Sequence, residues 1–219
     1  MARIEIIDVC KTIKRNTVID GINLTLESGK IFGLKGINGS GKTMLMRLIT
    51  GLIRPTKGRI RIDGKELWKD ISFPESVGLL LENPAFLDSC SGTENLRILA
   101  AIKANIDNAR IDETIRLVGL SVGDKKKYKK YSLGMKQRLG IAAAVMESPD
   151  IVILDEPTNS LDSDGVEMVK QVVRAEKQRG ALVILACHDF EILQELADEI
   201  YTMESGRITN AAIEERGIS

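Results

Sequence analysis

KIFGLKGINGSGKTMLMRLITGL, residues 30–52, sets the pattern Gly36-x-x-x-x-Gly41-Lys42-Thr43 between a strand-like apolar run and a helix-like run. Glycines let successive backbone N–H groups face one anion, and the N-terminus of the following helix adds positive partial charge. Lys42 is expected to reach the β- and γ-phosphates of a nucleotide, and Thr43 to offer its hydroxyl to Mg²⁺. The alternative is a glycine-rich turn that only starts a helix. The order of strand, loop and helix favours a phosphate-binding loop.

The composition limits the partners that the chain can have. Its 219 residues allow one sizeable core, and its 31 basic and 31 acidic side chains cancel to zero net charge. A neutral chain has no excess field for nucleic acid or anionic lipid, so no nucleic-acid partner is expected. The cysteines, Cys10, Cys90 and Cys187, are odd in number and widely spaced, which favours a reducing compartment. With no apolar run of about 18 residues, we expect a cytoplasmic protein.

The apolar pattern predicts an α/β fold. IVILD at 151–155 and ALVILAC at 181–187 are apolar without interruption, which is typical of parallel strands covered on both faces. The N-terminal runs alternate polar and apolar residues, which indicates antiparallel, half-exposed strands. Between about 83 and 146 only helical spacing remains. We expect one domain, with residues 1–82 and 147–219 forming the core and 83–146 an inserted helical subdomain.

Polar side chains follow two of these expected parallel strands. Asp155 ends the first and is the expected Mg²⁺ partner, and Glu156 next to it is placed to act as a general base. Alone, an apolar run followed by Asp-Glu is also an ordinary strand end. His188, the single histidine, ends the second strand. A lone histidine is often structural, but this position favours a γ-phosphate contact.

Four motifs together resemble one known family. GINGSGKT, YSLGMKQR, IVILDEPTNSLD and ACHD, in this order, are similar to the ATP-binding subunit of ATP-binding cassette (ABC) transporters. The variant YSLGMKQRLGIA and the stretch LLLENPAFLDSCSGTENL resemble the branch that exports bacitracin, lantibiotics and related antimicrobial peptides or drugs. The resemblance implies a P-loop NTPase (RecA-like) core, ATP hydrolysis with Mg²⁺, and a separate transmembrane permease. It also implies a peripheral position on the inner face of the membrane.

The resemblance further implies a head-to-tail dimer, of two copies or of this chain with a related cassette. Each ATP would lie between the phosphate-binding loop of one subunit and the SLG segment of the other. Ser132 begins a helix and Gly134 permits close backbone approach, so both can face a γ-phosphate. Asp162 would span the interface. From their own segments alone, Ser132 and Asp162 are also simple helix N-caps.

Two departures from the family pattern concern the nucleotide. Glu82 stands where a glutamine usually contacts Mg²⁺ or water, and Ile13 stands where an aromatic residue usually stacks on adenine. The expected catalytic residues are Lys42, Glu156 and His188, and the expected Mg²⁺ contacts are Thr43, Glu82 and Asp155. The expected ATP contacts are Ile13, Gly36, Ile37, Asn38, Gly39, Ser40, Gly41, Lys42, Thr43, Met44, Ser132, Gly134 and Asp162.

The surroundings of the SLG segment leave alternatives open. The permease is expected to dock on residues 83–105, although most apolar side chains there are equally typical of core. The lysine-rich run at 125–130 is interpreted as a solvated connector, with contact to acidic permease loops or anionic headgroups as the alternative.

A different class of protein, an ABC ATPase acting on nucleic acid or the ribosome, is the alternative function. Such proteins usually carry coiled coils, zinc modules or a second cassette. A small-molecule kinase would need neither SLGMKQR nor NSLD.

Overall fold

The computed structural model describes residues 1–82, 84–103 and 106–213. A six-stranded sheet forms its centre, and four neighbouring strands of this sheet, β6, β7, β8 and β3, are parallel. The strand order is β10-β9-β3-β8-β7-β6, with β9 also parallel to β3 and β10 antiparallel at the edge. The strands span β3 Ile31–Lys35, β6 Val77–Leu80, β7 Ile151–Asp155, β8 Leu182–Ala186, β9 Glu199–Glu204 and β10 Arg207–Ile213.

A second, four-stranded sheet contains the N-terminal strands. Its order is β2-β1-β4-β5, and all of its pairings are antiparallel, as the alternating pattern predicts. These strands span β1 Arg3–Ile13, β2 Asn16–Glu27, β4 Lys57–Ile62 and β5 Lys65–Glu66. The prediction of an α/β fold with a parallel centre and an antiparallel N-terminal part is therefore confirmed.

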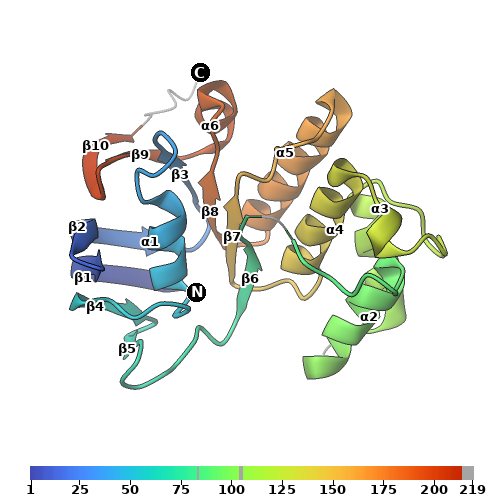
Figure 1. Cartoon of the computed structure of the whole chain (residues 1–219), viewed down its shortest axis with the longest axis horizontal. Helices are drawn as coiled ribbons and strands as arrows, with labels where there is room; N and C mark the ends of the chain where they lie inside the picture. Colours follow the sequence, from blue (N-terminus) through green and yellow to red (C-terminus); the bar gives the residue numbers. More distant parts are fainter. Residues whose placement is uncertain (83, 104–105, 214–219) are drawn as a thin grey trace.

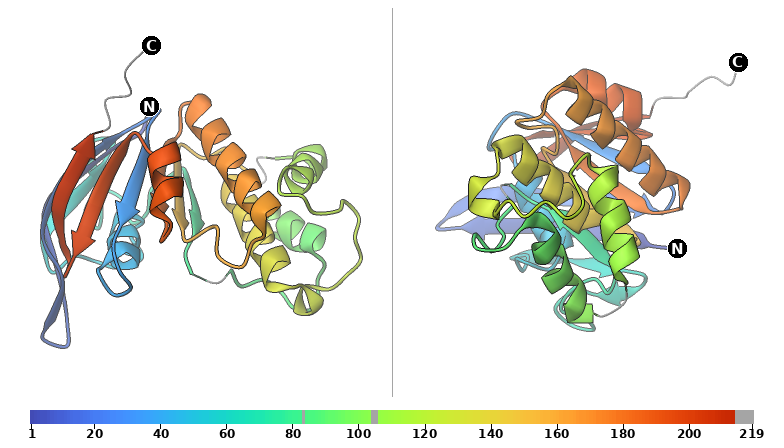
Figure 2. Two further views of the ribbon diagram at one scale, coloured as in Figure 1. Left: turned by 90° about the horizontal axis from the view of Figure 1, so that it is seen from above. Right: turned by 90° about the vertical axis from the view of Figure 1, so that its right-hand side faces the viewer.

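The helices gather mainly on one side of the molecule. They span α1 Lys42–Ile49, α2 Gly92–Lys103, α3 Asn108–Leu117, α4 Leu133–Val145, α5 Ser163–Gln178 and α6 Phe190–Leu196, with a 3₁₀ turn η1 at Tyr128–Lys130. In Figure 1 the strands occupy the left half and α2 to α5 the right half. Figure 2, seen from above, shows the same separation. None of the helices in the described ranges is long and apolar enough to cross a membrane.

The strand β7 shows why its sequence is apolar throughout. Val152 and Leu154 face the core that includes α4 and α5, whereas Ile151 and Ile153 face the core around α1 and the second sheet. Successive side chains of a strand point to opposite faces, so a strand between two cores needs apolar residues at every position. Burying both faces fixes the carboxyl end of β7, where Asp155 lies.

Helix α4 packs closely against strand β6. A Cβ atom at Gly78 would lie 1.7 Å from the carbonyl oxygen of Ala144, so only glycine lets the helix approach this strand. The contact joins the helical part of the chain to the sheet.

Candidate nucleotide site

The phosphate-binding loop follows β3 and leads into α1. Gly41 has a left-handed φ of 112° directly before the helix, a conformation that side chains disfavour. A Cβ at Gly36 would lie 2.5 Å from both the Met203 carbonyl oxygen and Ser40 Oγ. The buried Lys42 folds back over the loop, and its Nζ donates to the carbonyls of Gly36 at 2.6 Å and Ile37 at 3.3 Å. The lysine thus closes the loop into a ring.

Thr43 and Asp155 meet between this loop and β7. The Thr43 hydroxyl donates to Asp155 Oδ2 at 2.5 Å, and Asp155 is only 3% exposed. Burial raises the pKa of Asp155, while the bond from Thr43 and the charge of Lys42 lower it. The pair has the oxygen ligands that Mg²⁺ prefers. Nowhere in the described residues, this site included, do three His, Cys, Asp or Glu side chains cluster as a protein-only metal cage would need.

Glu156 is held in a left-handed conformation, with φ of 51°. Its Oε2 accepts the His188 backbone N–H at 3.0 Å, and His188 Nε2 lies 3.2 Å from Oε1. Lys42 Nζ is 4.0 Å from the same Oε1, yet this buried oxygen receives no hydrogen bond. Burial raises the pKa of Glu156, and the nearby His188 and Lys42 lower it. A buried carboxylate oxygen without a donor is a position that a water or ligand can fill.

A cleft of about 990 Å³ contains these groups. It lies at the carboxyl ends of four neighbouring parallel strands, because the loop after β3, Glu82 after β6, Asp155 at the end of β7, Glu156 directly after it, and His188 after β8 all line it. The expected residues that line the cleft are Asn38, Gly39, Ser40, Gly41, Lys42, Thr43, Met44, Glu82, Asp155, Glu156 and His188.

The cleft also contains residues to which the sequence analysis gives no role. Among them are Val18 of β2, Arg47 of α1 and Gln137 of α4. Arg47 follows Thr43 by four residues, so helical spacing places it on the same face, and that signal was available in the sequence. Ile13 does not line the cleft: it lies at the exposed end of β1, and Val18 of the neighbouring strand lines the cleft.

Ser132, Gly134 and Asp162 lie outside this cleft. Ser132 caps α4 by accepting the Met135 N–H, and Asp162 caps α5 by accepting the Gly165 N–H. Each therefore has the N-cap role that its own segment predicts. A Cβ at Gly134 would lie 2.9 Å from the Ser160 carbonyl oxygen, so the glycine permits a close approach within this chain.

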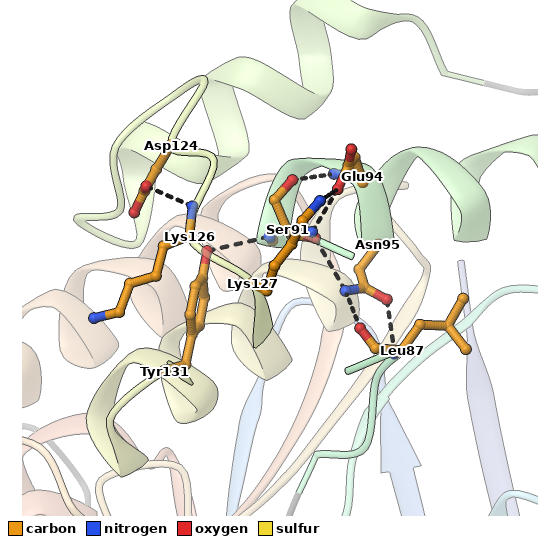
Figure 3. Close-up of polar contacts among 9 residues, drawn as sticks. Leu87, Ser91, Glu94, Asn95, Asp124, Lys126, Lys127 and Tyr131 are labelled. Atoms are coloured by element: carbon orange, nitrogen blue, oxygen red, sulfur yellow. Dashed lines mark hydrogen bonds and ion pairs between the residues drawn. The ribbon is translucent and has the colours of Figure 1, made fainter. Parts of the chain in front are cut away.

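The lysine-rich run before Ser132 is more than a solvated connector. Tyr128 is buried and donates to the Pro84 carbonyl at 2.5 Å, and buried Tyr131 accepts the Gly92 N–H at 3.1 Å. Lys127 Nζ donates to Glu94 at 3.1 Å (Figure 3). We call residues 84–95 together with 124–131 the brace. It fixes the segment before Ser132 against the start of α2.

The start of α2 within the brace is held by several side-chain hydrogen bonds. Ser91 and Glu94 form a capping box, in which the Ser91 N–H donates to Glu94 Oε2 at 2.6 Å and the Glu94 N–H donates to Ser91 Oγ at 3.2 Å. Asn95, 3% exposed, bonds the N–H and the carbonyl of Leu87 and the carbonyl of Ser91 (Figure 3). Positions 83 and 105, the ends of the expected docking segment, lie outside the described residues.

The apolar residues of that docking segment divide between core and surface. Leu96 is fully buried, Phe86 and Leu99 pack partly buried against the same core, and Leu87 is 53% exposed. Most of these side chains are therefore core residues of the helical part of the chain.

Comparison with known proteins relates this site to a family. The ABC transporter family model matches residues 19–159. YybJ, an ABC transporter ATP-binding protein of Bacillus subtilis, is 48% identical over 205 residues, 94% of each chain. BcrA of Enterococcus faecalis, a bacitracin transport ATP-binding protein, is 36% identical over 99% of this chain and 70% of its own. SrtF of Streptococcus pyogenes, a lantibiotic transport ATP-binding protein, is 33% identical over 90% and 85%.

Solved structures agree on the fold. An ATP-binding subunit of an ABC transporter superposes with a TM-score of 0.87 over 99% of this chain and 95% of its own, at 24% identity. A dimeric bacterial ABC transporter cassette gives 0.88 over 98% and 100%, also at 24% identity. With the family model and these relatives, the chain belongs to the ATP-binding proteins of ABC transporters and is an ABC ATPase.

Proposed function

We propose that the chain binds ATP with Mg²⁺ in the cleft and that hydrolysis drives a permease exporting an antimicrobial peptide or drug. The observation that carries the proposal is the meeting of Lys42, Thr43, Asp155, Glu156 and His188 in one cleft. The choice of cargo is supported by BcrA and SrtF, which are named for bacitracin and lantibiotic transport.

The cleft fits a magnesium nucleotide. Ser40 Oγ, on the phosphate-binding loop, is buried and has no hydrogen-bond partner among the described residues, so its hydroxyl is free to donate to a phosphate oxygen. Thr43 and Asp155 would hold the metal together with phosphate oxygens, and Glu82 is proposed to contact the metal or its water. When bound, Mg²⁺ would neutralise charge on the phosphates. The loop N–H groups and Lys42 would bind the phosphates themselves, and Ile13 is proposed to pack on the base from the end of β1.

Glu156 is proposed to take the proton of the attacking water. Its Oε1 is buried and lacks a hydrogen-bond donor, so a water at this oxygen would be oriented by the carboxylate. His188 lies beside the same oxygen and is proposed to contact the γ-phosphate. Lys42, at 4.0 Å from Oε1, would move from the loop carbonyls to the phosphates. All three groups act from fixed backbone positions, which lowers the cost of reorganisation.

The proposed dimer uses the surface at the start of α4. Ser132 and Leu133 are exposed there, and a helix N-terminus favours an anion. In a head-to-tail pair this end would meet the ATP of the partner subunit, with Gly134 allowing close approach and Asp162 near the interface. The dimeric cassette described above shares the fold. The permease would hold the pair at the inner face of the membrane, in the cytoplasm.

Replacing the proposed base tests this function. Glu156→Gln keeps the shape of the side chain but cannot take a proton, so kcat for ATP hydrolysis should fall roughly 100- to 10,000-fold. ATP binding should persist, and size-exclusion chromatography with ATP should show a stable dimer. Glu147→Gln is the matched control, because Glu147 is also mostly buried but pairs with Lys103 away from the cleft. Steady hydrolysis by Glu156→Gln would show that another group is the base.

A further inference from the structure

Arg47 lies in the nucleotide cleft on the same face of α1 as Thr43, one helical turn further along. Its Nη2 donates to Glu82 Oε1 at 2.8 Å. The two residues are 35 positions apart in the chain and belong to different elements, because Glu82 follows β6. The ion pair therefore joins the helix that carries the phosphate-binding loop to the segment that leaves the edge strand.

This ion pair contributes little to folding. The side chains of Arg47 and Glu82 are 34% and 61% exposed, and ion pairs this open to water add little to stability. Glu82 nevertheless has a left-handed φ of 52°, a conformation that costs a non-glycine residue energy. A strained residue in a weak ion pair at a binding cleft points to a role in the site rather than in the fold.

The charges of Arg47 and Glu82 both act on Asp155, the expected Mg²⁺ ligand. The pKa of Asp155 is raised first by burial, and the charge of Glu82 raises it further while that of Arg47 lowers it. Glu82, Asp155 and Glu156 place three carboxylates beside the loop that must receive a triphosphate. Among the described residues that line the cleft, Arg47 is one of three lysine or arginine side chains, with Lys42 and Lys136, and it is the one that pairs with Glu82.

We propose that Arg47 is a positioning residue of this site: it holds the Glu82 carboxylate and cancels its charge, so that a nucleoside triphosphate can bind next to a third acidic side chain. The inference rests on the proposed nucleotide site. It adds Arg47 as the residue whose positive charge allows a triphosphate to bind beside the Glu82 carboxylate. The Glu82 carboxylate and the phosphates of a nucleotide carry like charges, and water in the cleft screens their repulsion only partly. Losing the positive charge of Arg47 should therefore weaken nucleotide binding.

Binding of a fluorescent nucleotide tests the proposal without requiring hydrolysis. Trinitrophenyl-ATP would be titrated into wild type, Arg47→Gln, Glu82→Gln and the double variant, first in EDTA and then with Mg²⁺. In EDTA, Arg47→Gln should bind about threefold to tenfold more weakly, because Glu82 then repels the phosphates unopposed. The double variant should return to within about twofold of wild type, and Glu82→Gln alone should bind at least as tightly. The loss should shrink at high salt.

Arg3→Gln is the control, since it removes an arginine paired with Glu5 at 3.1 Å outside the cleft and changes the net charge equally. It should bind like wild type. If Arg47→Gln binds like wild type, or if the double variant stays as weak as Arg47→Gln, Arg47 does not act through Glu82 and the inference is wrong. Wild type that fails to bind the nucleotide at all would overturn the proposed function itself. Glu82→Gln leaves Arg47 in place, and weaker nucleotide binding by this variant would also contradict the inference.

Discussion

The nucleotide cleft and the brace differ in whether their buried polar side-chain atoms have hydrogen-bond partners. In the cleft, Ser40 Oγ and Glu156 Oε1 are buried without a hydrogen-bond partner. In the brace, no buried side-chain oxygen or nitrogen of the described residues lacks one, and Asn95 alone makes three hydrogen bonds. A buried polar atom without a partner costs free energy. The one further such side-chain atom among the described residues, Asp112 Oδ1 of α3, lies outside both regions. The contrast separates the part of the cleft that can take a ligand from the brace, although Pro84 and Tyr128 of the brace also line the cleft.

The largest difference between the two regions should appear at Asn95 and Ser40. Asn95→Ala leaves the Leu87 N–H without its acceptor and removes two further hydrogen bonds, to the Leu87 and Ser91 carbonyls, which each keep a backbone donor, so the free energy of unfolding should fall by about 1–3 kcal/mol. Ser40→Ala removes a hydroxyl that bonds nothing, so the nucleotide-free protein should change by less than about 0.5 kcal/mol. Urea unfolding of both variants measures this. If both variants lost the same free energy of unfolding, the distinction between the cleft and the brace would be wrong.

A smaller effect is expected at Tyr131. Tyr131→Phe keeps the buried ring but leaves the Gly92 N–H without its acceptor, which should cost about 1 kcal/mol. Hydrogen exchange of the Gly92 amide should become faster in the variant, because the loss is local. Phe32 makes its ring contact with Tyr201 in a different core, so amides near Phe32 are the internal reference. Unchanged exchange at Gly92 would mean that the hydroxyl does not secure the start of α2.

The smallest effect concerns Glu94 and depends on pH. Hydrogen bonds from the Ser91 backbone N–H, the Lys127 ammonium and the Ser91 hydroxyl lower the pKa of Glu94 from its usual 4.5 to about 2. A carboxyl whose pKa is lowered by folding stabilises the protein above its unfolded pKa, and this stability is lost as the pH falls from about 4.5 toward 2. The stability difference between wild type and Glu94→Gln should therefore shrink over that interval. Urea midpoints near neutral pH and in acid measure it, and a constant difference would contradict the lowered pKa.

The sequence predicts those parts of the fold that depend on local pattern. The run 151–155 needs two apolar faces and is β7, and the glycine pattern at 36–43 forms the loop before α1. Strand β10 was not anticipated, because an edge strand paired only with β9 needs no continuous apolar run. Asp155, Glu156 and His188 could be brought together from sequence, since the carboxyl ends of parallel strands meet at one edge.

Other features of the site depend on contacts between distant segments. The pairing of Arg47 with Glu82 joins residues 35 positions apart, and no local pattern specifies it. The same holds for the bond from Tyr128 to Pro84, which turns the lysine-rich run into part of the brace. The ATP contacts expected from Ser132 and Asp162 require a second subunit, so a single chain shows only their N-cap roles.

Helix α4 contacts both the proposed base and the start of α5 within one subunit. The side chain of Gln137 donates to the main-chain carbonyl of Glu156 at 3.0 Å, and Arg138 pairs with Asp162 at 3.2 Å. The same helix begins at Ser132, the residue proposed to meet the partner's ATP. A rotation of α4 would therefore pull on the backbone of the proposed base and on the start of α5 together. If occupancy at one end of this connection alters affinity at the other, linkage requires that whatever engages Ser132 and whatever occupies the site at Glu156 change each other's affinity by the same factor, even though the two ligands never touch.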